Sequence, residues 1–250
     1  RLAQMLKLSL WGNQVDLSLW PAGLGERPDH ASWQQGEAFL LSDQAQEAAA
    51  HLTRQPAERV DVLLDNAGQE LAFDLLLAAY LLGSGNARRV MLHVKPHPTY
   101  VSDATARDVL DTIAALQGQG GAPEAVGGRL AGWLRAGRPR LKADYFWTSP
   151  YAAWQMPASL MHNLRRSRLV ISKGDANYRR LVGDRHWEFE TPFAQVMSYF
   201  PAPLLALRTC KSEVMVGLMP GQAQALAARD DRWLTNGKWG VIQLAPSPSS

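Results

Sequence analysis

The sequence predicts an α/β fold, a three-layer Rossmann-like arrangement in which a mostly parallel sheet carries helices on both faces. Short runs rich in Val and Leu, such as Val60–Leu64, end at turn-prone residues and are typical of strands buried on both faces. Longer segments with apolar residues at helical spacing alternate with these runs. Alternation of strands and helices along a chain favours a parallel sheet between two helical layers.

The expected elements follow one another along the chain. Leu6–Leu10 and Asp16–Leu19 are expected to be short extended pieces around the polar turn Trp11-Gly12-Asn13. Strands are expected at Val60–Leu64, Arg88–Lys95, Leu141–Trp147, Ser167–Ser172, Leu204–Leu207 and Trp239–Leu244. Helices are expected at Asp43–Leu52, Gln69–Leu82, Ala106–Leu116 and Pro157–Arg165, with a short helical remnant at Gly132–Gly137. A mobile surface loop is expected at Gln117–Gly128, which is rich in Gly, Gln and Pro, and a frayed tail at Ala245–Ser250.

The most informative residues are Asp65 and Asn66, which follow the strand expected at Val60–Leu64. Open α/β sheets bind ligands at the carboxyl ends of their strands, and two adjacent oxygen donors there suit a hard divalent cation. Asp103 follows the next strand and precedes the helix expected at Ala106–Leu116, which puts a second carboxylate in the same topological position. Each of these residues is alternatively an ordinary helix cap. The sequence therefore predicts either a cation site or caps at this edge.

Two later strands deliver further polar residues to the same edge. Ser167–Ser172 runs into Lys173-Gly174-Asp175-Ala176-Asn177-Tyr178-Arg179, and Leu204–Leu207 runs into Arg208-Thr209-Cys210-Lys211. Four successive strands thus end in Asp, Asn, Lys or Arg, which solvation of the strand ends alone does not explain. The pattern indicates a polar ligand site built from several strand ends.

Composition limits the classes of function. The chain has 250 residues, enough for one large core or two modest ones, and no stretch approaches the roughly 18 uninterrupted apolar residues of a membrane span. A net charge of +3 with dispersed basic residues does not indicate nucleic acid as a partner. The single cysteine, Cys210, excludes an internal disulfide, and the first residues lack a signal-peptide profile. The sequence therefore favours a cytoplasmic protein without a nucleic-acid or membrane partner, and it leaves the oligomeric state open.

Several familiar catalytic motifs are absent from the sequence. There is no phosphate loop, no Gly-x-Gly-x-x-Gly after a strand and no Gly-x-Ser-x-Gly elbow. His93 and His97 are four positions apart, but Pro96 between them excludes a regular helix that presents both to zinc, so each is expected to pack or to support other side chains. Cys210 lacks an evident partner base and is expected to be a small buried filler rather than a nucleophile.

Five ordered motifs resemble one known family. They are Leu10-Trp11-Gly12-Asn13 with Asp16-Leu17-Ser18, Asp65-Asn66-Ala67-Gly68 with Glu70, Ser102-Asp103, the segment from Lys173 to Arg179, and Arg208-Thr209-Cys210-Lys211. In this order they resemble the damage-control phosphatase family in its subfamily III, whose signature is Arg-Thr-x-Lys and whose members were also described as acidic-residue methyltransferases. Members of that family begin with a long helical region that this chain does not show. We therefore expect residues 1–250 to be the family's α/β domain, as a fragment or a truncated member.

The resemblance implies roles for individual residues. The implied metal ligands are Asp65, Asn66 and Asp103. The implied substrate-binding residues are these three together with Asp175, Ala176, Asn177, Tyr178, Arg179 and Lys211. Asp65 and Asp175 are the implied catalytic residues: either Asp65 or a water attacks phosphorus, and Asp175 is a general base or accepts a hydrogen bond from a sugar hydroxyl. Asn13 and Asp16 are expected to line or brace the pocket.

The activity implied by the resemblance is metal-dependent hydrolysis of small phosphate esters, such as fructose 1-phosphate and related sugar phosphates, with Mn²⁺, Co²⁺ or Ni²⁺, or else Mg²⁺. One alternative is an S-adenosylmethionine-dependent protein-glutamate carboxyl methyltransferase, although Asp65-Asn66-Ala67-Gly68 is a poor match to the glycine-rich turn expected there. Another is a non-catalytic binding module. A further expectation concerns an apolar N-terminal edge that a preceding segment would cover, formed by Leu6, Leu8, Leu10, Trp11 and Trp20.

Overall fold

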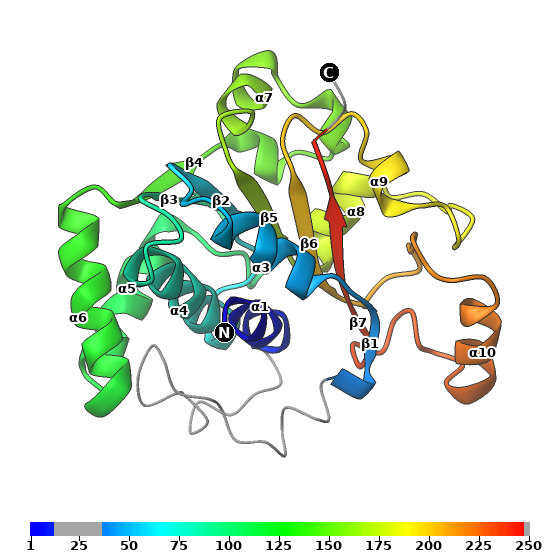
Figure 1. Ribbon diagram of the computed structural model, residues 1–250, viewed down its shortest axis with the longest axis horizontal. Coiled ribbons are helices and arrows are strands. Elements are labelled where there is room, and N and C mark those ends of the chain that lie inside the picture. The colour runs from blue at the N-terminus through cyan, green and yellow to red at the C-terminus, as the bar shows by residue number, and fades with distance from the viewer. Residues whose placement is uncertain (13–36, 248–250) are drawn as a thin grey trace.

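A computed structural model describes residues 1–12 and 37–247, which form a seven-stranded sheet between two layers of helices (Figure 1). The strands are β1 (Leu40–Asp43), β2 (Val60–Leu63), β3 (Val90–Val94), β4 (Pro139–Ala143), β5 (Leu169–Lys173), β6 (Leu204–Thr209) and β7 (Gly240–Ala245). Their order across the sheet is β1-β7-β6-β5-β2-β3-β4. The five strands from β6 to β4 are parallel, whereas β7 is antiparallel to β6 and parallel to β1. The expected α/β class with a mostly parallel sheet is confirmed.

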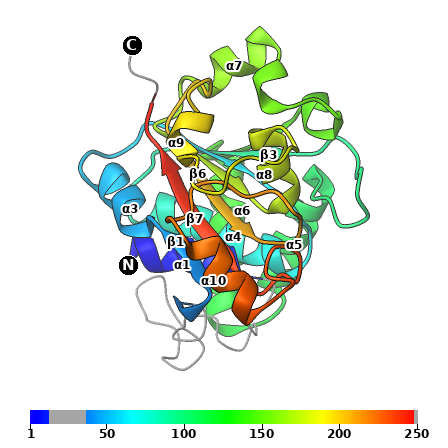
Figure 2. The same ribbon diagram turned by 90° about the vertical axis from the view of Figure 1, so that its right-hand side faces the viewer.

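Helices cover both faces of this sheet. On one face lie α1 (Leu2–Trp11), α3 (Ala45–Thr53), α4 (Gln69–Gly83), α5 (Ala106–Gln117) and α6 (Gly121–Arg135) (Figure 1). Packed on the other face are η2 (Tyr145–Thr148), η3 (Ala153–Gln155), α7 (Ala158–Leu164), α8 (Asp175–Val182), α9 (Phe193–Val196) and α10 (Gln222–Arg229) (Figure 2). Each layer has its own apolar core against the sheet.

Alternate residues of the central strands belong to these two cores. In β5, Leu169 and Ile171 pack in the core of the α1 and α4 layer, whereas Val170 packs in the core of the α8 layer. Because both faces of the central strands are covered, their residues are apolar at nearly every position rather than at every second one. This explains the continuous apolar runs in the sequence.

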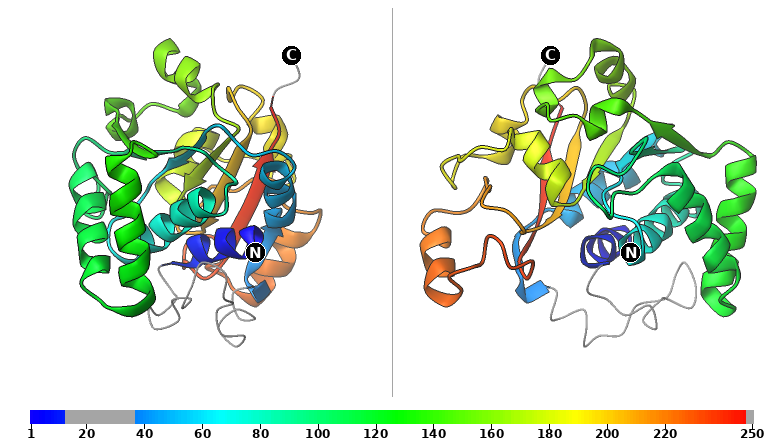
Figure 3. Two further views of the ribbon diagram at one scale, coloured as in Figure 1. Left: turned by 60° about the vertical axis from the view of Figure 1, so that its left-hand side comes forward. Right: turned by 180° about the vertical axis from the view of Figure 1, so that it is seen from behind.

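The direction in which the chain crosses the sheet reverses between β2 and β5. From β2 the chain passes through α4 to β3, and from β5 it passes through α8 to β6, on the opposite side of β2. The two connecting helices lie on opposite faces of the sheet (Figure 3). At such a switch point the strand ends diverge into a crevice, which is where open α/β sheets bind ligands.

The N-terminal segment is a helix, α1, and the expectation of an extended piece at Leu6–Leu10 is wrong. Leu6 and Leu8 are fully buried, and nearly every other side chain of α1 is buried as well. A helix that is buried all round has no polar face to reveal its period, so the alternating leucines were misleading. The domain itself covers these residues, which corrects the expected exposed N-terminal edge. Asn13, Asp16–Leu19 and Trp20 lie outside the described residues.

The loop expected at Gln117–Gly128 is also wrong, because most of this segment belongs to α6. Val126 and Leu130 of α6 are buried in the core. A Cβ atom at Gly127 would lie 2.9 Å from Gln117 and 3.0 Å from Leu116 at the end of α5, so glycine permits the two helices to approach closely. The glycines of this segment therefore serve helix packing, and the remnant expected at Gly132–Gly137 is mainly the last turn of the same helix.

The remaining expected elements are present with shifted bounds. The strand expected at Leu141–Trp147 corresponds to β4, which begins at Pro139 and ends at Ala143, before the short helix η2. The four-residue strand β1 was not expected, because so short an edge strand carries little pattern. The tail residues 248–250 lie outside the described residues.

Candidate functional site

The carboxyl ends of β2, β3 and β5 meet at one level of the sheet. In the parallel register, Leu63 of β2 pairs with His93 of β3 on one side and with Ser172 of β5 on the other. Two positions beyond these residues come Asp65, Lys95 and Gly174. The register therefore sets these three residues next to one another at the switch point.

A cavity of about 440 Å³ opens at this edge. Seven of the nine site residues expected from the sequence line it: Asp65, Asn66, Asp103, Asp175, Ala176, Arg179 and Lys211. Ala67, Tyr100 and Ser102 complete its wall. Motifs from four separate parts of the chain thus converge on one cavity, as the position of their strands predicted.

Asp103 does not cap helix α5. The cap is Thr105, which forms a capping box with the first turn of that helix. Oδ2 of Asp103 instead accepts hydrogen bonds from the main-chain N–H groups of Thr99 and Tyr100, each at 2.9 Å. The main chain of Asp103 also pairs with that of Asn66 in an isolated antiparallel bridge. The loop therefore holds this carboxylate at the cavity, and the capping alternative is excluded for Asp103.

The side-chain amide of Asn66 has a fixed orientation. Its Nδ2 donates to Oδ2 of Asp65 at 3.2 Å and to Oε2 of Glu70 at 3.0 Å, while its Oδ1 accepts from Oγ of Ser102 at 2.7 Å. Ionised carboxylates only accept hydrogen bonds, so they keep the amide nitrogen on their side. The amide oxygen is consequently turned toward Ser102 in the cavity wall.

Gly174 makes room for the side chain of Asp65. A Cβ atom at Gly174 would lie 1.8 Å from Oδ2 of Asp65, and the backbone φ of +80° is one that side-chain-bearing residues rarely adopt. Asp65 therefore occupies the space that a side chain at Gly174 would fill. This close approach gives a physical reason for the glycine between β5 and α8.

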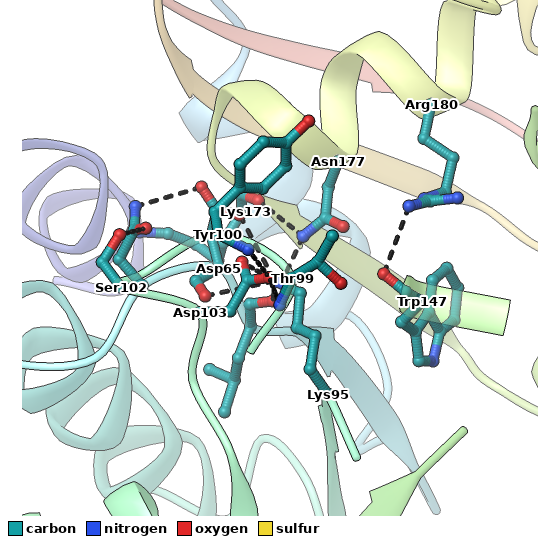
Figure 4. Close-up of polar contacts among 12 residues, drawn as sticks. Asp65, Lys95, Thr99, Tyr100, Ser102, Asp103, Trp147, Lys173, Asn177 and Arg180 are labelled. Carbon is teal, nitrogen blue, oxygen red and sulfur yellow. Dashed lines mark hydrogen bonds and ion pairs between the residues drawn. The ribbon is translucent and has the colours of Figure 1, made fainter. Parts of the chain in front are cut away.

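Lys95 lies between the two carboxylates of the cavity (Figure 4). Its Nζ atom is 3.4 Å from Oδ1 of Asp65 and 3.4 Å from Oδ1 of Asp103. It also donates hydrogen bonds to the main-chain oxygens of Leu64 and Asp65, at 2.9 and 3.1 Å. Lys95 was not among the expected site residues, although its place at the end of β3 was the available signal.

Lys173 extends the charged cluster into the core. Its Nζ atom is 2.8 Å from Oδ1 of Asp74 and 3.7 Å from Oε1 of Glu70, both on α4. It also donates to the main-chain oxygen of Ser9 in α1, and Oγ of Ser9 donates to Oδ1 of Asp74 at 2.6 Å. The residue before Gly174 therefore points away from the cavity and ties β5 to α1 and α4.

Carboxylates outnumber ammonium groups in this cluster, four to two within the described residues. The six groups, each at most 4% exposed, are Asp65, Glu70, Asp74, Asp103, Lys95 and Lys173. The pKa of Asp65 is raised to about 6, chiefly by burial; Lys95 opposes this shift, and Glu70 and Asp103 add to it. Burial also raises the pKa of Asp74 to about 6, against the effect of Lys173. The cluster is short of positive charge.

The donor groups at the cavity fit a divalent cation. Nowhere in the described part of the chain do three or more His, Cys, Asp or Glu side chains form a ready-made metal site. The candidate set consists instead of two carboxylates and one amide, from Asp65, Asp103 and Asn66. Hard cations prefer such oxygen ligands, and three protein ligands leave positions for water and substrate. The shortage of positive charge agrees with the same conclusion.

Arg208 holds Asp175 in place at the other end of the cavity. Oδ1 of Asp175 accepts hydrogen bonds from Nε of Arg208 at 2.7 Å, from Oγ of Ser212 at 3.0 Å and from the main-chain N–H of Lys211 at 3.2 Å. Arg208 is itself buried, with its guanidinium 4.3 Å from the ring centre of Tyr178. The Arg-Thr-Cys-Lys segment thus fixes an acidic side chain and presents the exposed Lys211 beside it.

Tyr178 and Asn177, both expected to bind substrate, lie elsewhere. Tyr178 is buried beneath the cavity, where its hydroxyl donates to Oε1 of Gln243 at 2.9 Å and its ring supports Arg208. Nδ2 of Asn177 donates to main-chain oxygens of Leu64 and Lys173, which links the ends of β2 and β5. Asn177 lines an adjoining cavity instead.

Arg179 lines the cavity but is already paired. Its Nε and Nη2 atoms bind the two carboxylate oxygens of Asp184 at 2.7 Å each. The bidentate pair offsets its charge, which the sequence did not reveal.

The buried roles expected of Cys210 and His93 are confirmed. Cys210 is fully buried, and burial raises the pKa of its thiol to about 11, so the thiol stays protonated at neutral pH. His93 is buried, with Nε2 2.6 Å from Oδ1 of Asp61. Neither residue lines the cavity.

The switch point of this α/β sheet combines an acidic cluster that is short of positive charge with the exposed Lys211. Such a site is typical of the class of proteins that bind a metal ion together with an anionic ligand. The family model described as the damage-control phosphatase ARMT1-like domain matches residues 1–226. The chain belongs to this family. No helix in the described residues is long and apolar enough to span a bilayer.

Curated relatives agree with this family. The chain is 39% identical over 261 residues to damage-control phosphatase ARMT1 of Rattus norvegicus and 36% identical over 254 residues to that of Homo sapiens. Each alignment covers 96% of this chain and 58% of the relative, so the chain spans little more than half the length of these proteins.

A solved structure agrees with the fold. The crystal structure of a DUF89 family protein from Pyrococcus horikoshii matches with a TM-score of 0.51 and 19% identity, covering 97% of this chain and 65% of that one. At this identity the likeness bears on the fold alone.

Proposed function

We propose that this protein is a metal-dependent phosphatase acting on small phosphate monoesters. The observation that carries the proposal is the single cavity whose wall combines Asp65, Asn66 and Asp103 with Lys211. Oxygen ligands suit a hard cation, and a lysine beside them suits a phosphate group. Membership of the damage-control phosphatase ARMT1-like family supports phosphate-ester hydrolysis among the reactions such a site can perform.

In this proposal Asp65, Asn66 and Asp103 hold the cation, which when bound polarises the phosphoryl group and lowers the pKa of bound water. Lys211 stabilises the negative charge that develops on the phosphoryl oxygens. Because Arg208 fixes one oxygen of Asp175, this carboxylate is a rigid acceptor for a substrate hydroxyl or for the proton of an attacking water. If Asp65 itself attacks phosphorus, rapid acid quenching will trap a phosphorylated chain, and if water attacks it will not.

The finer details are part of the proposal. We take the substrates to be sugar phosphates such as fructose 1-phosphate and the metal to be Mn²⁺, Co²⁺ or Ni²⁺, with Mg²⁺ as the alternative. The open cavity of about 440 Å³ has room for a phosphorylated sugar. A cytoplasmic location fits both this substrate class and the single, fully buried cysteine.

The first experiment measures release of inorganic phosphate from a panel of sugar phosphates, with each metal and with a chelator. We expect metal-dependent release that Asp103→Asn reduces severely while the protein stays folded. The same preparation is incubated with S-adenosylmethionine and glutamate-containing peptides, and we expect no methyl transfer. A folded chain that binds Mn²⁺ but releases phosphate from no member of the panel would overturn the proposal.

A further inference from the structure

Two further cavities adjoin the candidate active site. Their volumes are about 340 and 420 Å³, and they share Tyr100 and Ala176 with the wall of the cavity described above. Arg180 lines both of them but not the cavity that contains Asp65. A ligand that extends from the acidic end past Tyr100 therefore reaches Arg180.

The guanidinium of Arg180 is held by main-chain oxygens and lies over the ring of Phe146, 5.5 Å from its centre. Its Nη1 donates to the carbonyl oxygens of Ser149 and Tyr151, at 2.6 and 2.8 Å. Its Nη2 donates to that of Trp147 at 3.2 Å (Figure 4). Its Nε is buried and has no partner among the described residues. Carbonyl groups fix the position of the guanidinium, but they carry no net charge to balance it.

The other charged residues of these two walls are paired. Arg179 is bound to Asp184 through two hydrogen bonds, and Lys95 lies 3.4 Å from Asp103. Arg180 has no carboxylate within 4 Å among the described residues, and it is the one such cation in the two walls. Burial lowers the pKa of Arg180, and the charges of Tyr100 and Asp103 oppose this shift without forming an ion pair; an arginine remains charged in proteins. A partly buried cation that has no paired carboxylate is costly unless an anion joins it.

We propose that Arg180 binds a second anionic group of the substrate, a carboxylate or phosphate, at the end remote from the phosphate that is removed. This inference rests on the proposed function and narrows it to phosphorylated sugar acids and sugar bisphosphates. Arg180 follows Ala176 by four residues on α8, about 6 Å along the helix axis, so the two anionic groups are separated by several carbon atoms. The second N–H of Nη2, which these carbonyl bonds leave free, can donate one charge-assisted hydrogen bond to either group.

The competing explanation is that Arg180 only anchors the segment from Trp147 to Tyr151. The two roles differ in what they change. An anchor affects every substrate alike, whereas an anion site affects only substrates with a charged remote end. A matched pair of probes separates them: 6-phosphogluconate and sorbitol 6-phosphate are both open chains with the phosphate on carbon 6, and only the first has a carboxylate at the other end.

The experiment compares the Michaelis constants of this pair for the wild type, Arg180→Gln, Arg180→Lys and the control Arg185→Gln. Arg185 is an exposed cation beyond the end of α8 that lines none of the three cavities. We expect the wild type to favour 6-phosphogluconate by about tenfold, the worth of one charge-assisted contact. Arg180→Gln should lose this preference by raising the Michaelis constant of the acid alone, Arg180→Lys should keep part of it, and Arg185→Gln should keep all of it.

Equilibrium binding of both probes to the same variants separates this inference from the proposed function. If binding shows the preference for the acid but no phosphate is released, the anion site stands and the phosphatase proposal fails. If phosphate is released but wild type shows no preference, or Arg180→Gln weakens both probes equally, Arg180 is only an anchor and the inference is overturned. Melting temperatures are recorded for each variant, and Arg180→Lys decides the matter where Arg180→Gln does not fold.

Discussion

Two buried aspartates, Asp61 near the start of β2 and Asp65 two residues beyond its end, have pKa values shifted in opposite directions. Asp61 accepts bonds from Nε and Nη2 of Arg59, at 2.7 and 2.5 Å, and its Oδ1 lies 2.6 Å from Nε2 of His93. Burial alone would raise its pKa, but the hydrogen bonds of His93 and Arg59 outweigh burial and lower it. Asp65 is buried to a similar degree, yet its pKa is raised to about 6.

The difference lies in the supply of positive charge. Asp61 is paired with Arg59, which also donates to Asn163 but is shared with no second carboxylate among the described residues. Asp65 shares Lys95 with Asp103 and lies near the further carboxylate of Glu70. A buried carboxylate that is left short of cations destabilises the domain unless a ligand supplies the charge. Asp61 is therefore a paired structural carboxylate, whereas Asp65 lacks the charge that the proposed metal ion would supply.

The largest expected effect is a reversal between Asp61→Ala and Asp65→Ala. Asp61→Ala should lower the free energy of unfolding by about 3–5 kcal/mol, because it leaves the buried guanidinium of Arg59 without its carboxylate partner. Asp65→Ala should leave stability in chelator nearly unchanged and reduce kcat/KM for a sugar phosphate by at least about a thousandfold. Chemical denaturation and phosphate release measure the two effects.

Asp103→Ala is an independent test of the same assignment, because it removes the second acidic ligand of the proposed metal site. We expect it to behave as Asp65→Ala does. Phosphatase activity within about threefold of wild type in either variant would contradict the metal assignment.

The next effect concerns Lys211, the last residue of the Arg-Thr-Cys-Lys segment, which adds a positive charge to the wall of the cavity. Lys211→Ala should lower kcat/KM by about a hundredfold, through a higher KM and a lower kcat, because in the proposed function its contact with the phosphate strengthens as charge develops. Calorimetric titration of Mn²⁺ should give a nearly unchanged affinity, since an ammonium group is not a ligand. Lys238→Ala, at an exposed lysine that does not line the cavity, is the control. Unaltered kinetics on every sugar phosphate would place Lys211 outside the reaction.

The fold could be predicted from the sequence in its central strands but not in two of its helices. Strands buried on both faces are recognisable as continuous apolar runs, and their alternation with helices predicted the parallel sheet. The helix at Leu2–Trp11 was not predicted, because it is buried all round and shows no helical period. The helix at Gly121–Arg135 was not predicted, because its glycines, which serve close packing, are typical of loops. In both cases contacts between distant segments outweigh local preference.

For the site, strand-end position was sufficient to gather Asp65, Asn66, Asp103 and Lys211 at one cavity. It could not show how charges are shared there. Side-chain directions cannot be read from a single sequence. They determine the pairing of Arg179 with Asp184 and the place of Lys95 between two carboxylates. Tyr178 shows the same limit, because it belongs to the motif and yet supports Arg208 from beneath.

A smaller effect tests the pKa of Asp65 directly. Because the folded-state pKa is raised from 3.8 to about 6, the favourable contribution of the protonated form is full below about pH 4 and is lost as pH rises through 6. In chelator, Asp65→Asn should match the wild type at pH 4 and exceed its free energy of unfolding at pH 7 by roughly 1–3 kcal/mol. Chemical denaturation across this range measures the difference. Saturating Mn²⁺ should reverse its sign at pH 7, because only the wild type gains from binding.

The outcome for Asp61→Asn under the same conditions sharpens the comparison. The pKa of Asp61 is lowered, so its contribution to stability is present above about pH 4 and is lost in acid. This variant should therefore be less stable than the wild type at pH 7. If both asparagine variants shift stability in the same direction at pH 7, the contrast between the two aspartates is wrong.

The smallest expected effect is that of Ser9→Ala, which tests whether α1 stabilises the charge of the acidic cluster. Oγ of Ser9 donates to Oδ1 of the buried Asp74, whose pKa is raised to about 6, and this bond favours the ionised carboxylate. Ser9→Ala should lower the free energy of unfolding by about 1–2 kcal/mol at pH 8 and by less at pH 5, where Asp74 is protonated in the folded state. Ser198→Ala, at an exposed serine, should cost less than about 0.5 kcal/mol at either pH. An equal loss at pH 5 and pH 8 would show that Ser9 does not distinguish the two forms of Asp74, and the cluster would then end at Lys173.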